Sequence, residues 1–149
     1  MALISADQLI EQNQQVFEKF RHPEIHGIEP HSDPALNKLV EEKLRSTDLA
    51  KGVILDGYPA SKEQGDYLAN LIQELHLPKP MIIRLRAPDD VVRKRLQEEN
   101  AEDVGQRLKD YHRELDFAPL YFPQADIHDI DATKPPATVT KEIQKVLPK

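Results

Sequence analysis

The sequence predicts a single α/β domain, residues 1–149, in which a parallel sheet of about four strands has helices on both faces. Short apolar segments alternate with segments of helical periodicity, an order typical of parallel sheets. The run Gly52–Leu55 is continuously apolar and is bounded by turn residues, as a buried strand would be. A chain of 149 residues also fits one hydrophobic core, which favours one domain.

The N-terminal segment predicts a strand, a helix and then a loop. Ala2–Ser5 can form a short strand, and Asp7 would lie near the N-terminus of the helix that follows. The apolar stripe of that helix would contain Leu9, Val16, Phe17 and Phe20. Residues 21–33 are loop-like because prolines, a glycine and histidines interrupt them. The polar cap and proline of Ser32–Pro34 then predict the start of another helix.

The middle of the chain predicts a strand, a helix and a second strand. After the apolar run Gly52–Leu55, Ser61 is followed three residues later by Gln64, a capping-box pattern that predicts a helix start. The core side of this helix would carry Tyr67, Leu68, Leu71, Ile72 and Leu75. Met81–Leu85 is predicted to be a further strand.

The C-terminal part predicts three helices and one strand. Pro88 begins a helix, and a second long helix is expected from Glu102 to about Tyr121, with the acidic residues 97–103 between the two. Ile127–Ile130 is predicted to be a short strand, and the prolines of Thr133–Pro136 begin a terminal helix.

The composition argues against several classes of protein. A formal net charge of −6 leaves no excess of Lys and Arg to neutralise phosphates, so we expect no binding to nucleic acid or to membranes. Without cysteine, no disulfide or thiolate metal site can form. The first residues do not resemble a signal peptide, and no stretch reaches the roughly 18 apolar residues of a membrane span. We therefore expect a cytoplasmic protein.

One segment carries a family signature. Gly52–Pro59, with the order Gly-Val-Ile-Leu-Asp-Gly-Tyr-Pro, strongly resembles the signature of adenylate kinases, and Gln64 stands where the family has a glutamine. One further block similar to the family lies upstream, and four lie downstream, all in family order. They are Ser5–Leu9, Arg95–Leu96, Gln106–Tyr111, Ala118–Tyr121 and Ile130–Pro135. On these residues the chain is identified as a divergent member of the adenylate kinase (nucleoside-monophosphate kinase) family. The resemblance implies a P-loop-kinase-like three-layer sandwich.

The resemblance also implies a set of nucleotide-binding residues, which are Ser5, Asp56, Gly57, Gln64, Arg95 and Arg107. Asp56, at a strand end, would organise the water shell of a magnesium ion that accompanies the nucleotide. Gln64 would offer a donor and an acceptor to an adenine edge, or serve only as a capping residue. Arg107 has the planar guanidinium that phosphate oxygens need, or is a solvated helix arginine. Asp56 and Arg107 would be remnants of a catalytic site.

The departures from the family concentrate on phosphate binding. The 149 residues contain no Gly-x-x-Gly-x-Gly-Lys segment, and the first strand of the family sheet has no counterpart. Two family arginines that would hold the monophosphate are Ile10 and Ala60. Residues 21–48 would be the monophosphate-binding helical insert, whereas the lid is reduced to the acidic residues 97–103. Phosphoryl transfer depends on stabilising spread negative charge, so we expect no catalysis by the chain as it stands.

The missing strand leaves two structural alternatives. Either Gly52–Leu55 pairs directly with Met81–Leu85, or a groove with open strand edges remains, which would suit a protein partner or a homodimer. His22, His26 and His31 lie in one loop without helical context, so we expect no metal site.

Three hypotheses of function remain open. The chain is an inactive adenylate-kinase-like domain with a residual AMP-like pocket, which works through a partner. Alternatively, it is a truncated or split adenylate kinase that transfers phosphate from ATP to AMP once an upstream P-loop completes it. Alternatively, it is a protein-interaction module that kept the fold and binds no ligand.

Overall fold

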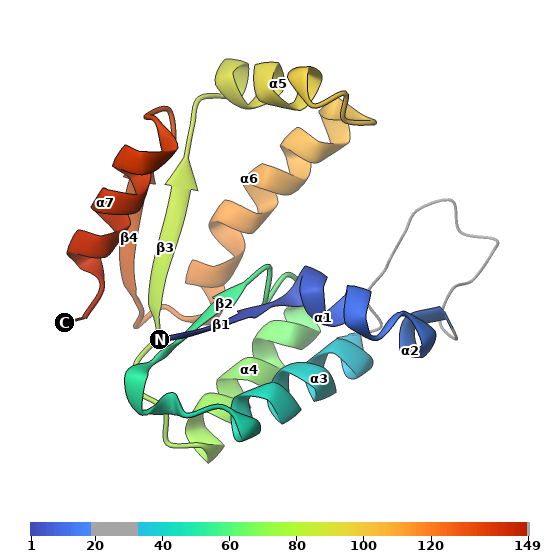
Figure 1. The fold of residues 1–149 in the computed structure, drawn as a ribbon, viewed down its shortest axis with the longest axis vertical. Helices are drawn as coiled ribbons and strands as arrows, with labels where there is room; N and C mark the ends of the chain where they lie inside the picture. Colours follow the sequence, from blue (N-terminus) through green and yellow to red (C-terminus); the bar gives the residue numbers. More distant parts are fainter. Residues whose placement is uncertain (19–32, 149) are drawn as a thin grey trace. The chain divides into compact units, whose positions relative to one another are not determined.

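A computed structural model describes residues 1–18 and 33–148 of the chain (Figure 1). The chain divides into two compact units, Met1–Leu77 and Pro78–Lys149, called here the N-terminal and the C-terminal unit. Each unit contains a two-stranded parallel sheet and its own helices. The expectation that residues 1–149 act as one domain stays a prediction.

Within residues 1–18 and 33–77, the N-terminal unit contains two strands and four α-helices. In chain order these are β1 (Ala2–Ser5), α1 (Ala6–Gln12), α2 (Gln14–Glu18), α3 (Asp33–Ser46), β2 (Val53–Asp56) and α4 (Lys62–Glu74). A short 3₁₀ turn, Leu49–Lys51, precedes β2. The two strands are parallel and pair from Ala2 with Val53 to Ser5 with Asp56. Both therefore end at the same edge of the sheet.

The core of the N-terminal unit lies between its helices. Leu36, Val40 and Leu44 recur every four residues along α3 and are at most 1% exposed. They face a partner because α3 packs against both α1 and α4, and α4 contributes the buried Leu68 and Leu71. Burying each of these side chains contributes about 1.5–3 kcal/mol, so this helix layer is a main source of the unit's stability.

The first helix is shorter than the apolar stripe predicts. It breaks at Asn13, whose side-chain amide donates a hydrogen bond of 2.8 Å to the Leu9 carbonyl, and the chain resumes as α2. Such local bonding by asparagine competes with the helical pattern. Leu9 and Phe17 are buried as predicted, whereas Val16 is exposed. Phe20 lies outside the described residues.

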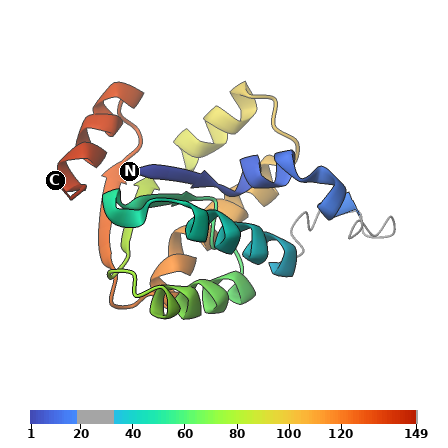
Figure 2. The ribbon, with the colours of Figure 1, turned by 60° about the horizontal axis from the view of Figure 1, so that its bottom comes forward.

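The C-terminal unit contains two strands and three helices. They are β3 (Met81–Arg86), α5 (Asp89–Glu98), α6 (Val104–Tyr121), β4 (Asp126–Asp131) and α7 (Pro136–Val146). The strands are parallel and pair from Met81 with Asp126 to Arg86 with Asp131. Figures 1 and 2 both show α7 beside β4 and α6 beside β3. Ile130 of β4 and Leu108 of α6 are among the buried residues of this unit.

The acidic segment between α5 and α6 is a tight turn. Asn100 and Asp103 have positive φ angles of 53° and 45°, and the Ala101 amide donates back to the Leu96 carbonyl at 2.9 Å. Asp103 then caps α6, because its Oδ1 accepts from the Gln106 amide at 3.0 Å. The expectation of a lid in 97–103 stays a prediction, and the structure gives those residues the role of a helix–helix connection.

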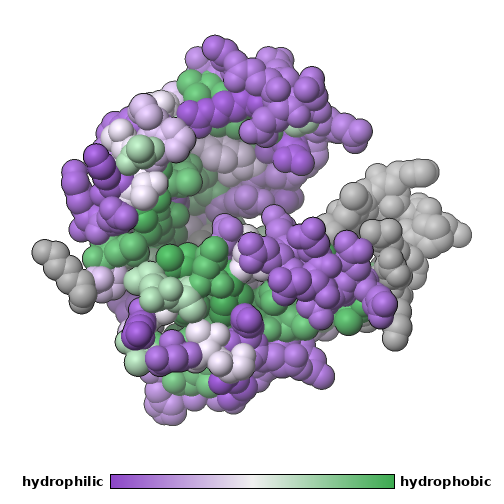
Figure 3. Space-filling model, in the orientation of Figure 1, coloured by the Kyte–Doolittle hydropathy of each residue, from purple (hydrophilic) through white to green (hydrophobic). Residues whose placement is uncertain are grey.

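The four strands form two sheets. Direct pairing of residues 52–55 with 81–85 is absent from the part of the chain that the structure describes, since β2 pairs with β1 and β3 with β4. In the β1–β2 sheet, the register partners Leu3 and Ile54 are 56% and 41% exposed, whereas Ile4 is buried. Hydrophobic surface is accordingly in view over β1 and β2 in Figure 3. None of the described helices is long and apolar enough to cross a membrane.

Candidate functional site

The carboxyl ends of β1 and β2 bring together three residues that the sequence analysis singled out. Ser5 and Asp56 are the last register pair of the sheet, and Gly57 follows directly. Gly57 has φ +69°, a left-handed backbone conformation that favours glycine, although a Cβ there would make only an ordinary contact of 3.5 Å with the Ala6 Cβ. In parallel α/β sheets, ligands bind at this edge, and Asp56 is exposed there.

Gln64 occupies a different environment, since it is only 1% exposed. Its backbone amide donates to the Ser61 hydroxyl at 3.2 Å, which confirms the predicted helix start. Its side-chain Oε1 accepts from the Ala60 amide at 2.7 Å. This contact makes Gln64 a capping residue that shapes the turn before α4. Recognition of a base by Gln64 stays a prediction.

A buried polar contact holds the same turn to α3. The Tyr58 hydroxyl donates to Asn37 Oδ1 at 2.6 Å, and both residues are 6% exposed. Tyr58 belongs to the segment that follows β2, and Asn37 belongs to α3. Because buried polar groups need partners, this bond links the conformation after Asp56 to the helix layer.

A cavity of about 250 Å³ opens in the C-terminal unit, near the ends of β3 and β4. Its walls are largely apolar and come from Leu85, Ala87, Val92, Leu96, Tyr111 and Ala132. Two charged residues also line it, Arg95 in the last turn of α5 and Glu99, the residue that caps the C-terminus of this helix. The Arg95 guanidinium donates to the Ala132 carbonyl at 2.8 Å, which ties α5 to the segment after β4.

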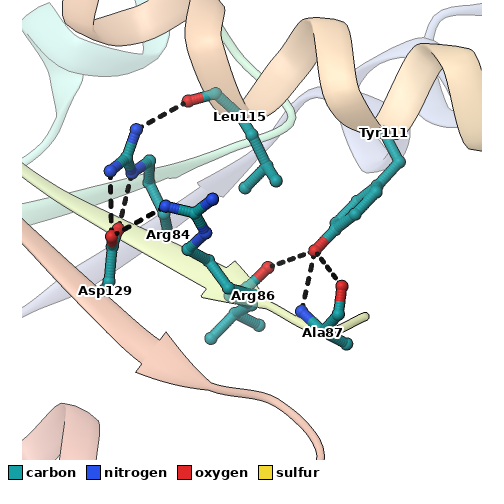
Figure 4. Close-up of polar contacts among 7 residues, drawn as sticks. Arg84, Arg86, Ala87, Tyr111, Leu115 and Asp129 are labelled. Carbon is teal, nitrogen blue, oxygen red and sulfur yellow. Dashed lines mark hydrogen bonds and ion pairs between the residues drawn. The ribbon is translucent and has the colours of Figure 1, made fainter. Parts of the chain in front are cut away.

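Tyr111 anchors one wall of this cavity. Its hydroxyl oxygen accepts from the Ala87 amide at 2.8 Å, and the hydroxyl lies 3.3 Å from the Leu85 and Ala87 carbonyl oxygens (Figure 4). The ring therefore cannot turn away without breaking its contact with the end of β3.

An ion-pair cluster crosses the same sheet. Arg84 of β3 binds Asp129 of β4 in a bidentate manner, at 2.6 and 2.9 Å, and also donates to the Leu115 carbonyl of α6 at 3.3 Å (Figure 4). Arg86 adds a bond of 3.1 Å to the same carboxylate. The bond from Arg84 is the main reason that the pKa of Asp129 lies below its ordinary value. The cluster joins β3, β4 and α6.

A second cavity of about 360 Å³ shares Ala87 and Tyr111 with the first. Its lining includes Arg86, Asp89 and His112. The His112 Nε2 lies 2.9 Å from Asp89 Oδ1, so the pair connects α6 to the first turn of α5.

The remaining predicted residues are less informative. Arg107 is exposed on α6, and its guanidinium has no recorded ion pair among the described residues. The loop histidines His22, His26 and His31 lie outside the described residues. Within residues 1–18 and 33–148, no group of three or more His, Cys, Asp or Glu side chains could hold a metal ion.

Comparison with known families decides the assignment. The adenylate kinase family model matches residues 28–125, about two thirds of the chain. The chain belongs to the adenylate kinase family. The match spans α3, β2, α4, β3, α5 and α6, so it includes both units and the signature segment after β2.

Curated relatives agree with this assignment. Over 121 residues the chain is 31% identical to the adenylate kinase of Cyanothece sp., covering 73% of this chain and 61% of the relative. Over 134 residues it is 29% identical to that of Sinorhizobium medicae, covering 78% and 69%. Over 134 residues it is 30% identical to that of Mesorhizobium japonicum, covering 78% and 67%. The chain therefore spans roughly two thirds of the length of these adenylate kinases.

Several features of this adenylate kinase family member were missed by sequence reasoning. The Arg84–Asp129 pair joins residues 45 positions apart, and only the strand register brings them together. A signal was present, because two arginines two residues apart end Met81–Arg86 and two aspartates two residues apart end Asp126–Asp131. The place of Glu99 in a cavity wall was also missed, since it depends on how α5 meets the strand ends.

Proposed function

We propose that this domain binds an adenine nucleotide or nucleoside without transferring phosphate. The proposal rests on which residues stand at two positions close in sequence to the carboxyl ends of β1 and β2. Ile10 and Ala60 stand where the family would place arginines for the monophosphate, although Ser5, Asp56 and Gly57 keep the family order there. The order of residues at this edge thus supports a nucleotide site that lacks two charges which would hold the phosphate.

The C-terminal unit contains, within that unit alone, a second candidate surface for a base. Its apolar cavity beside Arg95 has the character of ligand sites, which combine mostly hydrophobic walls with a few polar groups. The printed sequence adds no glycine-rich phosphate loop, because its five glycines are widely scattered. Each unit by itself is therefore expected to bind the phosphate of a nucleotide only weakly.

Magnesium would enter only with a nucleotide. Asp56 offers one exposed carboxylate and Ser5 one hydroxyl at adjacent strand ends, a donor set that fits a hydrated ion shared with phosphate oxygens. When bound, the ion would neutralise phosphate charge. The two residues would orient its water shell.

Restoring the missing charges tests the proposal. We expect AMP to bind the wild-type chain with a dissociation constant of roughly 1 µM to 1 mM, about −4 to −8 kcal/mol. Ala60→Arg and Ile10→Arg should each tighten AMP binding about tenfold, because a charge-assisted hydrogen bond contributes roughly 1.5–3 kcal/mol before screening. Adenosine affinity should not change. Calorimetric titration measures both, and an unchanged AMP affinity in both variants would contradict the phosphate-site assignment.

A second candidate is a phosphotransferase completed by residues outside these 149. It is favoured by one observation, that the matched relatives are longer than the matched segment. Ile10 and Ala60 count against it, since added residues would not change them. Expressing the complete product of the locus and measuring ADP formation from ATP and AMP separates the two candidates.

A further inference from the structure

One face of the β1–β2 sheet is hydrophobic and exposed. Side chains alternate between the two faces of a strand, so the register partners Leu3 and Ile54 share one face and Ile4 lies on the other. Leu3 and Ile54 are 56% and 41% exposed, whereas Ile4 is 3% exposed (Figure 3). Parallel sheets are normally buried on both faces, so the face with Leu3 and Ile54 has the character of an interface.

Met1 extends this hydrophobic surface at the amino ends of the strands. It is 50% exposed, and its side chain lies against Gly52, since a Cβ at Gly52 would be 3.6 Å from the Met1 Cε. Glycine has no side chain, so Gly52 leaves this space to Met1. Leu3 and Ile54, with Met1 at the amino end, are called here the apolar face.

The two ends of the apolar face carry opposite charges. At the carboxyl end, Asp56 follows Ile54 by two residues, lies on the same face and is exposed. The exposed Asp7 adds a second carboxylate there, in the first turn of the helix that follows β1. At the amino end, Lys51 is exposed immediately before Gly52. In the part of the chain that the structure describes, neither Lys51 nor Asp56 takes part in an ion pair.

This arrangement of charges is complementary to itself. A two-fold axis perpendicular to the strands, at the level of Leu3 and Ile54, would reverse the strand direction of a second copy. Leu3 and Ile54 would then face their own counterparts, as hydrophobic side chains do between sheets packed about 10 Å apart. Lys51 of each copy would approach Asp56 of the other. Opposite charges would therefore meet at both ends of the interface.

We propose that the apolar face is the interface of a homodimer, in which two copies pack their β1–β2 sheets face to face with opposite strand directions. The inference goes beyond the proposed function, because it assigns a partner to one face of the sheet and requires no nucleotide. Each strand has four residues, about 13 Å in length. The contact is thus smaller than the roughly 800 Å² per partner of a standard interface, and we expect a weak dimer with a dissociation constant of roughly 100 µM.

Sedimentation of the full chain without nucleotide tests the inference. The wild type should change from monomer to dimer between about 10 µM and 1 mM. Ile54→Lys should weaken the dimer by at least about tenfold, because it removes hydrophobic surface and brings two ammonium groups together at the axis. Val16→Lys is the matched control and should leave the dimer unchanged, since Val16 is also β-branched and 41% exposed but belongs to α2. If Ile54→Lys does not fold, Ile54→Thr keeps the strand preference and should still weaken the dimer several-fold.

Charge reversal tests the strand directions. Lys51→Glu should weaken the dimer several-fold at low ionic strength, because it opposes two carboxylates across the interface. Combining it with Asp56→Lys should restore the dimer. Lys51 and Asp56 lie at opposite ends of the same strand region, so restoration requires a second copy.

A cysteine introduced near the axis gives an independent test. The chain has no cysteine of its own, so a disulfide formed by Ile54→Cys must join two copies. Mild oxidation should link Ile54→Cys into a covalent dimer, because a residue near a two-fold axis lies close to its counterpart. Val16→Cys should be linked much more slowly.

Three results would overturn the inference. One is a wild-type chain that stays monomeric at about 1 mM, whose apolar face is then bare, covered within one chain or covered by another protein. Another is a dimer that survives Ile54→Lys, or that Val16→Lys weakens equally, since its interface would lie elsewhere. The third is a double charge reversal that fails to restore the dimer, which would contradict the opposite strand directions.

Discussion

Replacing Tyr58 by phenylalanine removes one oxygen atom from the interior of the N-terminal unit. It belongs to the Tyr58 hydroxyl, which donates to Asn37 Oδ1 at 2.6 Å. Tyr58 and Asn37 are each 6% exposed, so water cannot easily replace the lost donor. A buried acceptor left without its partner costs about 1–3 kcal/mol. We therefore expect Tyr58→Phe to lower the free energy of unfolding by about 2 kcal/mol.

The same α3 helix provides a matched control. The Tyr67 hydroxyl also donates to a side chain of α3, the Glu41 carboxylate, which is four residues beyond Asn37. In that variant, Glu41 would still accept a hydrogen bond of 2.8 Å from the Arg45 guanidinium, and its carboxylate is accessible to water. Tyr67→Phe removes the same atom and should cost clearly less, since the carboxylate is left with other partners.

Urea denaturation followed by circular dichroism measures both variants. Thermal denaturation gives the melting temperature. For a chain of about this length, a loss of 1 kcal/mol in the free energy of unfolding lowers the melting temperature by about 2–4 °C, so Tyr58→Phe should melt about 4–8 °C below the wild type. Unchanged slopes of the denaturation curves would show that only stability has changed. Equal losses in the two variants, or no loss in Tyr58→Phe, would refute the reasoning that burial makes this hydrogen bond important.

Three further predictions concern single side chains. Asp129→Asn should lower stability by less than about 1 kcal/mol at neutral pH, because the pair is partly exposed. The folded state lowers the pKa of Asp129, so the ionised carboxylate contributes to stability above its unfolded pKa, and this contribution is lost as the pH falls through its folded pKa. The melting curves of variant and wild type should therefore converge in acid. Tyr111→Phe should lower the free energy of unfolding by about 1 kcal/mol, because the Ala87 amide loses its acceptor. It should also weaken adenosine binding, and calorimetry measures both effects. Gln64→Ala should lower the free energy of unfolding by about 1–2 kcal/mol, because it removes the acceptor of the partly buried Ala60 amide. A selective loss of AMP affinity at unchanged stability would instead indicate base recognition.

The elements of the fold could be predicted from local patterns. All four strands and the helix starts near Ser61, Pro88 and Pro136 are found close to the expected positions, because apolar runs and caps are encoded by neighbouring residues. The family could be predicted from the segment Gly52–Pro59. The break at Asn13 could not, since a side chain that bonds its own helix looks like any polar position in the pattern.

The candidate site was less predictable, because it depends on residues distant in the sequence. Ser5 and Asp56 were expected separately, and only the strand register makes them neighbours. Gln64 was expected both as a cap and as a base contact, and burial decides which contact the structure contains. The cavity beside Arg95 combines two helices with the ends of two strands, so no local pattern reveals that Glu99 lines it.

The most direct test of the account is a phosphorus NMR time course of ATP and AMP with magnesium in the presence of the chain. The account predicts that both nucleotides persist and that no ADP forms above the protein-free control, since we propose that Ile10 and Ala60 stand where the family has phosphate-binding arginines. Enzyme-dependent formation of ADP by these 149 residues would contradict the central claim that the domain binds without transferring phosphate.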